Sequence, residues 1–132
     1  CMKASIFFRN TSFCLILTAL IGSCAGPPQR DCSAFKTGKY TFTTVNGLDT
    51  LTTTFERFET IEIDQFQGEI DTSTVKWIND CEFILRNINP TSNAEKQAIH
   101  IKILETDLEG YRFEYGRLSD PIKLKGYAKK IQ

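Results

Sequence analysis

The sequence has very few of the residues that usually carry out chemistry or hold metals. His100 is the only histidine among 132 residues, so a histidine-rich metal site is excluded by count. No serine or cysteine lies in a recognisable nucleophile motif, and His100 falls at an outward position of a predicted strand. We therefore expect no enzyme activity, no metal and no cofactor.

The sequence also lacks an excess of charge of either sign, with 16 basic and 16 acidic side chains. Proteins that bind nucleic acids concentrate Lys and Arg on one face. Here the only cluster consists of Lys123, Lys125, Lys129 and Lys130. Lysines on an edge strand discourage pairing between sheets, which explains this cluster. We therefore expect no nucleic-acid partner.

Acidic side chains are frequent between residues 49 and 71, where a pair of them could in principle form a glycosidase site. The residues concerned are Asp49, Glu56, Glu59, Glu62, Asp64, Glu69 and Asp71. Most occupy polar positions of strands or turns, so we expect them on solvated faces. The spacing from residue 64 to residue 71 matches no EF-hand.

Long apolar runs are missing as well. The apolar stretch of residues 13–21 is too short to span a bilayer as a mature helix, and it follows the basic Lys3 and Arg9. This arrangement indicates an export signal over residues 1–23. Its removal leaves 14 basic and 16 acidic side chains, a formal charge of −2.

The end of this segment, residues 20–24, resembles the lipobox of bacterial lipoproteins, with an aliphatic residue and two small residues before Cys24. In that family the peptidase cuts before the cysteine, whose thiol then carries lipid. Each buried methylene contributes about 0.8 kcal/mol to membrane binding. The resemblance implies lipidation at Cys24, a tether over residues 24–31 and one domain over residues 32–132. An uncleaved anchor and a plain secretory signal are the alternatives.

We expect an exported protein, held on a bacterial membrane of the cell envelope by its N-terminal lipid. No aspartate follows Cys24, so retention at the inner membrane is not indicated and the outer membrane is favoured.

Two cysteines remain in the predicted domain, Cys32 and Cys81. Two thiols in an exported domain suggest one disulfide. Two free buried thiols or a redox pair are the alternatives, although the Cys-x-x-Cys spacing of many redox pairs is absent.

Apolar residues alternate with polar ones along most of the domain, which predicts strands separated by tight turns. Residues 74–88 form the central example, with Val75 and Trp77 on one face of a first strand and Phe83 and Leu85 on one face of a second. Asn46-Gly47 predicts another hairpin. For residues 95–104 a helix competes with a strand, and three isoleucines at every second position favour the strand.

About eight such strands, without a ten-residue helical pattern, predict an all-β fold: a single antiparallel meander that closes into a small barrel. Its predicted inward residues are Tyr40, Phe42, Leu51, Phe55, Ile61, Ile63, Val75, Trp77, Phe83, Leu85, Ile99, Ile101, Ile103, Tyr111, Phe113 and Tyr115.

Three segments resemble a group of short Bacteroidota lipoproteins of unknown function. They are residues 35–40, Arg57 with the Glu-rich strand after it, and residues 75–83. The resemblance covers residue 32 to about residue 115 and implies a lipocalin-like fold and an envelope location. Some members carry a topoisomerase IV label, but an exported, slightly acidic domain of this size offers neither the DNA-binding domain nor the metal-binding carboxylates of such an enzyme.

Lipocalin-like barrels hold small apolar ligands, and the inward aromatic residues suit that role. The candidate ligand-binding residues are Tyr40, Phe42, Phe55, Arg57, Trp77, Phe83, Tyr111, Phe113 and Tyr115. Arg57 would bind a ligand carboxylate, cap the barrel rim or pair with Glu59. The alternative is a filled core, in a monomeric lipoprotein that docks on another envelope protein.

Overall fold

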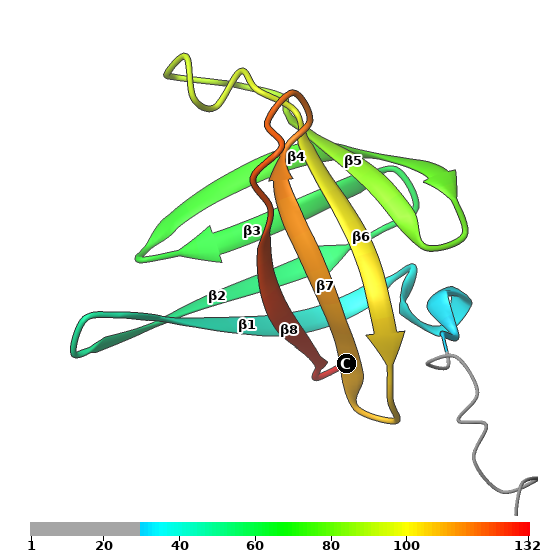
Figure 1. Cartoon of the computed structure of the whole chain (residues 1–132). Helices are drawn as coiled ribbons and strands as arrows, with labels where there is room; N and C mark the ends of the chain where they lie inside the picture. The colour runs from blue at the N-terminus through cyan, green and yellow to red at the C-terminus, as the bar shows by residue number, and fades with distance from the viewer. Residues whose placement is uncertain (1–29) are drawn as a thin grey trace, which may run out of the picture.

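The computed structural model describes residues 30–132, which form an all-β barrel (Figure 1). Each strand pairs antiparallel with the next, and β8 closes the barrel against β1. The strands are β1 Gly38–Asn46, β2 Asp49–Arg57, β3 Ile61–Phe66, β4 Glu69–Asn79, β5 Glu82–Asn87, β6 Ile99–Thr106, β7 Gly110–Arg117 and β8 Leu124–Lys130. The predicted meander barrel is confirmed, and so is the strand favoured over a helix within residues 95–104, which is β6 from Ile99 onward. The predicted signal, with Cys24, lies outside the described residues.

The β3–β4 and β4–β5 turns contain residues that favour turn conformations. Gly68 and the preceding Gln67 both have positive φ, 81° and 49°, and they join β3 to β4 as a two-residue hairpin turn. Between β4 and β5, the side-chain oxygen of Asn79 accepts a hydrogen bond from the Cys81 amide at 2.9 Å. Local side-chain chemistry thus fixes both turns.

The central hairpin forms over the predicted strands, and its two predicted faces meet. Val75 lies opposite Leu85, and Trp77 lies opposite Phe83 with ring centroids 4.5 Å apart. Cross-strand pairs of this kind stabilise a sheet face. A bulge between Trp77 and Asn79 then leads into the turn.

Strand β3 turns inward the face that was predicted to point outward. Ile61 and Ile63 face outward, whereas Glu62 is only 3% exposed and lines the interior with Asp64 and Phe66. The prediction placed the isoleucines inside because alternation was assumed to bury the apolar set. It also placed the two acidic residues on a solvated face, which is wrong for the same reason. The buried partner of Glu62, described below, sets this orientation.

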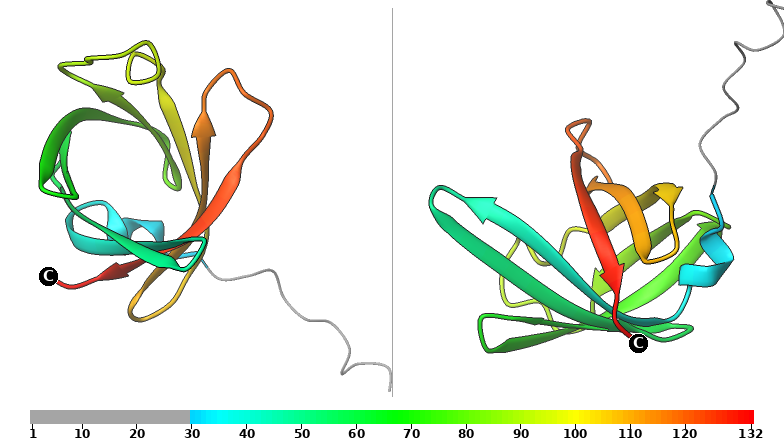
Figure 2. Two further views of the ribbon diagram at one scale, coloured as in Figure 1. Left: turned by 90° about the vertical axis from the view of Figure 1, so that its left-hand side faces the viewer. Right: turned by 90° about the horizontal axis from the view of Figure 1, so that it is seen from below.

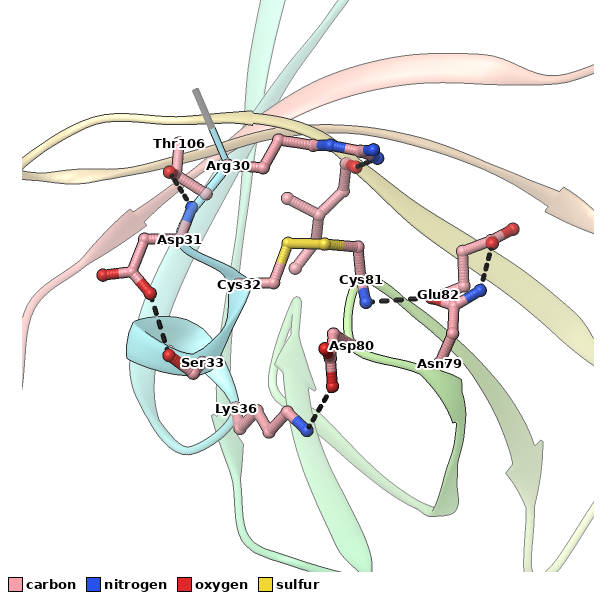
Figure 3. The surroundings of a disulfide bond; sticks show 11 residues. Arg30, Asp31, Cys32, Ser33, Lys36, Asn79, Asp80, Cys81, Glu82 and Thr106 are labelled. Carbon is pink, nitrogen blue, oxygen red and sulfur yellow. Dashed lines mark hydrogen bonds and ion pairs between the residues drawn. A yellow bond between two sulfur atoms is a disulfide. The ribbon is translucent and has the colours of Figure 1, made fainter. Parts of the chain in front are cut away.

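A short 3-10 helix, η1 (Cys32–Phe35), closes one end of the barrel (Figure 1). The predicted disulfide is confirmed: Cys32 is bonded to Cys81 in the β4–β5 turn (Figure 3). Upstream of the helix, the amide of Asp31 donates to the Thr106 hydroxyl and Arg30 donates to the carbonyl of Ile103 on β6. The N-terminal entry is therefore fastened to β4, β5 and β6.

The opposite end of the barrel is open. Here the β1–β2 hairpin extends away from the rest of the wall, as Figures 1 and 2 show. Strand β1 pairs with β8 only over Tyr40–Phe42, and β2 pairs with β3 only over Thr54–Arg57. The outer part of the hairpin thus pairs with itself alone among the described strands. Within residues 30–132 no helix has the length and apolar character of a membrane span.

Candidate functional site

Arg57 lies at the centre of the closed half of the barrel. It is 1% exposed and donates hydrogen bonds from all three guanidinium nitrogens. Nε donates to the Lys36 carbonyl at 3.1 Å, Nη1 to the Glu62 carboxylate at 2.9 Å, and Nη2 to the Phe35 carbonyl at 2.8 Å. Nη2 also lies 3.0 Å from the hydroxyl of Tyr111. Arg57 thus pairs with Glu62, directly opposite it on β3, and not with Glu59.

Aromatic rings surround this guanidinium group. Its central carbon lies 4.5 Å from the Phe83 ring centroid and 5.0 Å from that of Tyr40, which is within cation–π range. Burial alone would lower the pKa of Arg57, but its interactions with Tyr111 and Glu62 outweigh this and raise the pKa above its usual value. Burial raises the pKa of Tyr111 and Tyr40. The closed half is therefore a packed core around one charged pair.

A cavity of about 300 Å³ lies above this packed half, in the open half of the barrel. Its wall is mostly apolar and aromatic. The lining residues are Phe42, Thr53, Phe55, Arg57, Glu62, Asp64, Phe66, Ile101, Tyr111, Phe113 and Tyr115. The barrel is thus filled at one end and hollow at the other.

The structure brings six of the nine predicted ligand-binding residues together around this cavity. They are Phe42, Phe55, Arg57, Tyr111, Phe113 and Tyr115. Tyr40 and Phe83 are fully buried in the packed half, and Trp77 packs against Phe83, so these three do not line the cavity. Arg57 reaches the cavity wall with each of its nitrogens already donating to the protein.

The predicted ligand-binding set lacked five of the lining residues, although Ile101 was predicted to face inward. The five are Thr53, Glu62, Asp64, Phe66 and Ile101. Three of them belong to β3, whose orientation was predicted the wrong way round. The spacing of Arg57 and Glu62 in the sequence could have indicated this. A short turn between two strands places these residues opposite one another, so an inward Arg57 implies an inward Glu62.

Asp64 is the acidic residue with the most perturbed environment. It lies two residues beyond Glu62 on the inner face of β3 and opposite Asp71 on β4. Burial, followed by the charge and hydrogen bonding of Glu62 and the charge of Asp71, raises the pKa of Asp64 to about 8. This carboxyl group is therefore mostly protonated at neutral pH.

Asp64 also lines a second recess of about 360 Å³, next to the cavity and closer to the barrel mouth. This recess is more polar, with Asp71, Glu95 and Arg117 in its wall. No group of three or more His, Cys, Asp or Glu among residues 30–132 is arranged to hold a metal ion. The recess therefore offers charge at the mouth of the cavity without a metal site.

His100 lies on the outer side of β6, away from the cavity. Its Nε2 is 3.0 Å from a carboxylate oxygen of Glu82. Glu82 also accepts a hydrogen bond from the Asn79 side chain. This bond is the largest cause that lowers the pKa of Glu82; burial opposes it, and the charge of His100 adds to it. The pair joins β6 to the beginning of β5 on the outside of the wall.

No family model, curated protein or solved structure matches this chain. The site is therefore interpreted from its own geometry. That geometry comprises a closed, charged and packed base, an aromatic cavity above it, and acidic groups at the mouth.

Proposed function

We propose that this protein is a lipoprotein of the bacterial envelope, anchored through Cys24, whose barrel binds a small apolar ligand without catalysis. The cavity of about 300 Å³ in the open half carries this proposal. Its size falls at the lower end of known ligand sites, and its wall combines apolar rings with a few polar groups, as such sites do.

A second candidate function is an interaction lipoprotein that docks on another envelope protein. The loops and strand ends at the open end carry many exposed apolar side chains, which favours this candidate. They include Val45, Leu48, Ile70, Ile88, Leu118 and Ile122. The two functions are compatible if the docking partner supplies or receives the ligand.

A substitution that fills the cavity tests ligand binding. Thr53 is half-buried and lines the cavity, so Thr53→Trp places a large ring in the space that the ligand would occupy. We expect its affinity for the fluorescent probe N-phenyl-1-naphthylamine to fall at least tenfold, or by more than about 1.4 kcal/mol. Direct fluorescence titration measures this effect.

Thr52→Trp is the matched control, because Thr52 is the exposed neighbour on the outer face of β2. It adds the same ring and the same intrinsic fluorescence, and we expect wild-type affinity. Equal probe affinity in all three proteins would refute binding in the cavity.

The membrane anchor is tested by Cys24→Ser, which removes the thiol that would carry the lipid. We expect the protein to move from the membrane fraction to the soluble fraction of the envelope, since the lost lipid removes about 0.8 kcal/mol of membrane binding for each buried methylene. Immunoblots of fractionated cells measure the distribution. Cys14→Ser, in the predicted signal segment, is the control, and retention of Cys24→Ser in the membrane would exclude lipidation at this site.

A further inference from the structure

The polar groups at the cavity determine which ligand head group it accepts. Arg57 is the obvious candidate for a carboxylate, but its charge is already compensated by Glu62 at 2.9 Å. Its other nitrogens donate to the main-chain carbonyls of Lys36 and Phe35, which lie on the closed side. A ligand carboxylate would therefore have to displace bonds that hold the base of the barrel together.

The charged side chain of the cavity wall that lies outside the Arg57–Glu62 ion pair is Asp64. This residue is half-buried and lines both the cavity and the recess at its mouth. No ion pair joins it to a cation among residues 30–132. It therefore lies where the head group of a ligand would sit, with the apolar part on the rings below.

The charged groups that face Asp64 are mainly acidic. They are Glu62 on its own strand, Asp71 on β4, Glu95 in the β5–β6 loop, Arg57 on β2 and Arg117 on β7. With Asp64 ionised, the interior and mouth hold four carboxylates against two guanidinium groups. Another negative charge is therefore disfavoured there, and a positive one is favoured.

We propose that the cavity binds an amphiphile with a cationic head, an alkylammonium group, whose nitrogen donates to Asp64 while its chain lies against Phe42, Phe113 and Tyr115. This inference rests on the proposed ligand-binding function and names the ligand class for the same cavity. The site is the aromatic cavity itself, and Asp64 sets its preference for charge. Aromatic faces near the head group add cation–π attraction.

The volume sets the length of the chain. At about 30 Å³ for each water-sized group, a cavity of about 300 Å³ holds roughly ten such groups. Ten-carbon probes are therefore suitable, and three of them differ only in the head group: decylamine, decanol and decanoic acid.

Binding of the cation must also depend on pH. In the free protein Asp64 binds its proton up to about pH 8, whereas an alkylammonium ion, with a pKa near that of lysine at about 10.4, stays charged. The ammonium ion favours ionised Asp64, so binding releases a proton and affinity rises with pH. We expect an increase approaching tenfold per pH unit below about pH 8, and no such dependence for decanol.

The experiment measures displacement of N-phenyl-1-naphthylamine by the three probes at pH 6, 7 and 8. We expect decylamine to bind at least about tenfold more tightly than decanoic acid at pH 8, as a charge-assisted hydrogen bond predicts. Asp64→Asn should remove both this preference and the pH dependence while decanol binding remains, which also shows that the variant is folded. Glu56→Gln, a neutralised carboxylate on the outer face of β2, should retain both properties.

Two results would overturn the inference. In the first, decanoic acid binds the wild-type protein as tightly as decylamine or more tightly; in the second, Asp64→Asn keeps the preference for the amine. In both cases decanol would still bind and the proposed ligand-binding function would stand. Failure of all three probes would instead overturn that function together with the inference.

Discussion

Replacing Arg57 by Met is expected to destabilise the barrel by about 3–5 kcal/mol, the typical cost of removing one partner of a buried ion pair. The substitution leaves the Glu62 carboxylate buried without its cation and removes donors to the Phe35 and Lys36 carbonyls. Urea denaturation, followed by the fluorescence of Trp77, measures the loss. A typical domain has a total stability of about 5–15 kcal/mol, so this loss is a large fraction of the whole.

Two further variants separate the ion pair from general packing. Arg86→Met on β5 is the control, because Arg86 is exposed, and it should change the free energy of unfolding by less than about 0.5 kcal/mol. The double variant Arg57→Met with Glu62→Leu should recover part of the loss, since neither charge is then left unpaired. An Arg57→Met barrel as stable as the Arg86→Met control would contradict this account of the base.

Loss of the disulfide is expected to have a similarly large effect. Cys32 and Cys81 are 49 residues apart in the sequence, and closing a loop of that length stabilises the folded state by about 4 kcal/mol in the chain-entropy model. The variant with both cysteines replaced by Ser should therefore unfold at a lower urea concentration. The wild-type protein should shift by a similar amount when a reductant is added.

The double serine variant is also the control for the reductant, because it has no disulfide to lose and its unfolding midpoint should not change. If reduction left the wild-type midpoint unaltered while the bond was shown to be open, the disulfide would contribute no stability. The loss would then have to be assigned to the serine substitutions themselves.

The sequence predicted the barrel because its strands are defined by local signals. Alternation identified the strands, and turn-forming residues such as Asn46-Gly47 identified the hairpins. In the central hairpin the two apolar faces were large enough to indicate the inner side without ambiguity. The two inner faces of this hairpin followed from these features, whereas the disulfide of Cys81 was predicted from the presence of two cysteines in an exported domain.

Strand β3 shows where local signals end. Its alternation was recognised, but the inner side depended on a partner in the neighbouring strand. Glu62 faces inward because Arg57 lies opposite it and needs a counter-charge in a buried position. Alternation shows that a segment is a strand. It does not show which of the two faces points inward when a buried ion pair competes with the burial of apolar side chains.

The candidate site depends on a further non-local feature. The sequence identified the inward aromatic residues, but it could not divide them between the packed base and the cavity. That division follows from η1. The ring centroids of its Phe35 and of Tyr111 are 5.5 Å apart, and the Phe35 carbonyl accepts a hydrogen bond from Arg57. A four-residue helix without apolar periodicity gives almost no signal in a sequence.

The covalent link between η1 and the β4–β5 turn also decides how the protein bears mechanical tension. Strand β1 closes the barrel over only three register pairs with β8, so a pull on the N-terminus through β1 would peel this seam first. With Cys32 bonded to Cys81, a load applied upstream of residue 30 enters the middle of the wall instead. Resistance to forced unfolding is governed by the unfolding rate, so we expect reduction of this bond to lower the force at which the N-terminal segment detaches from the barrel.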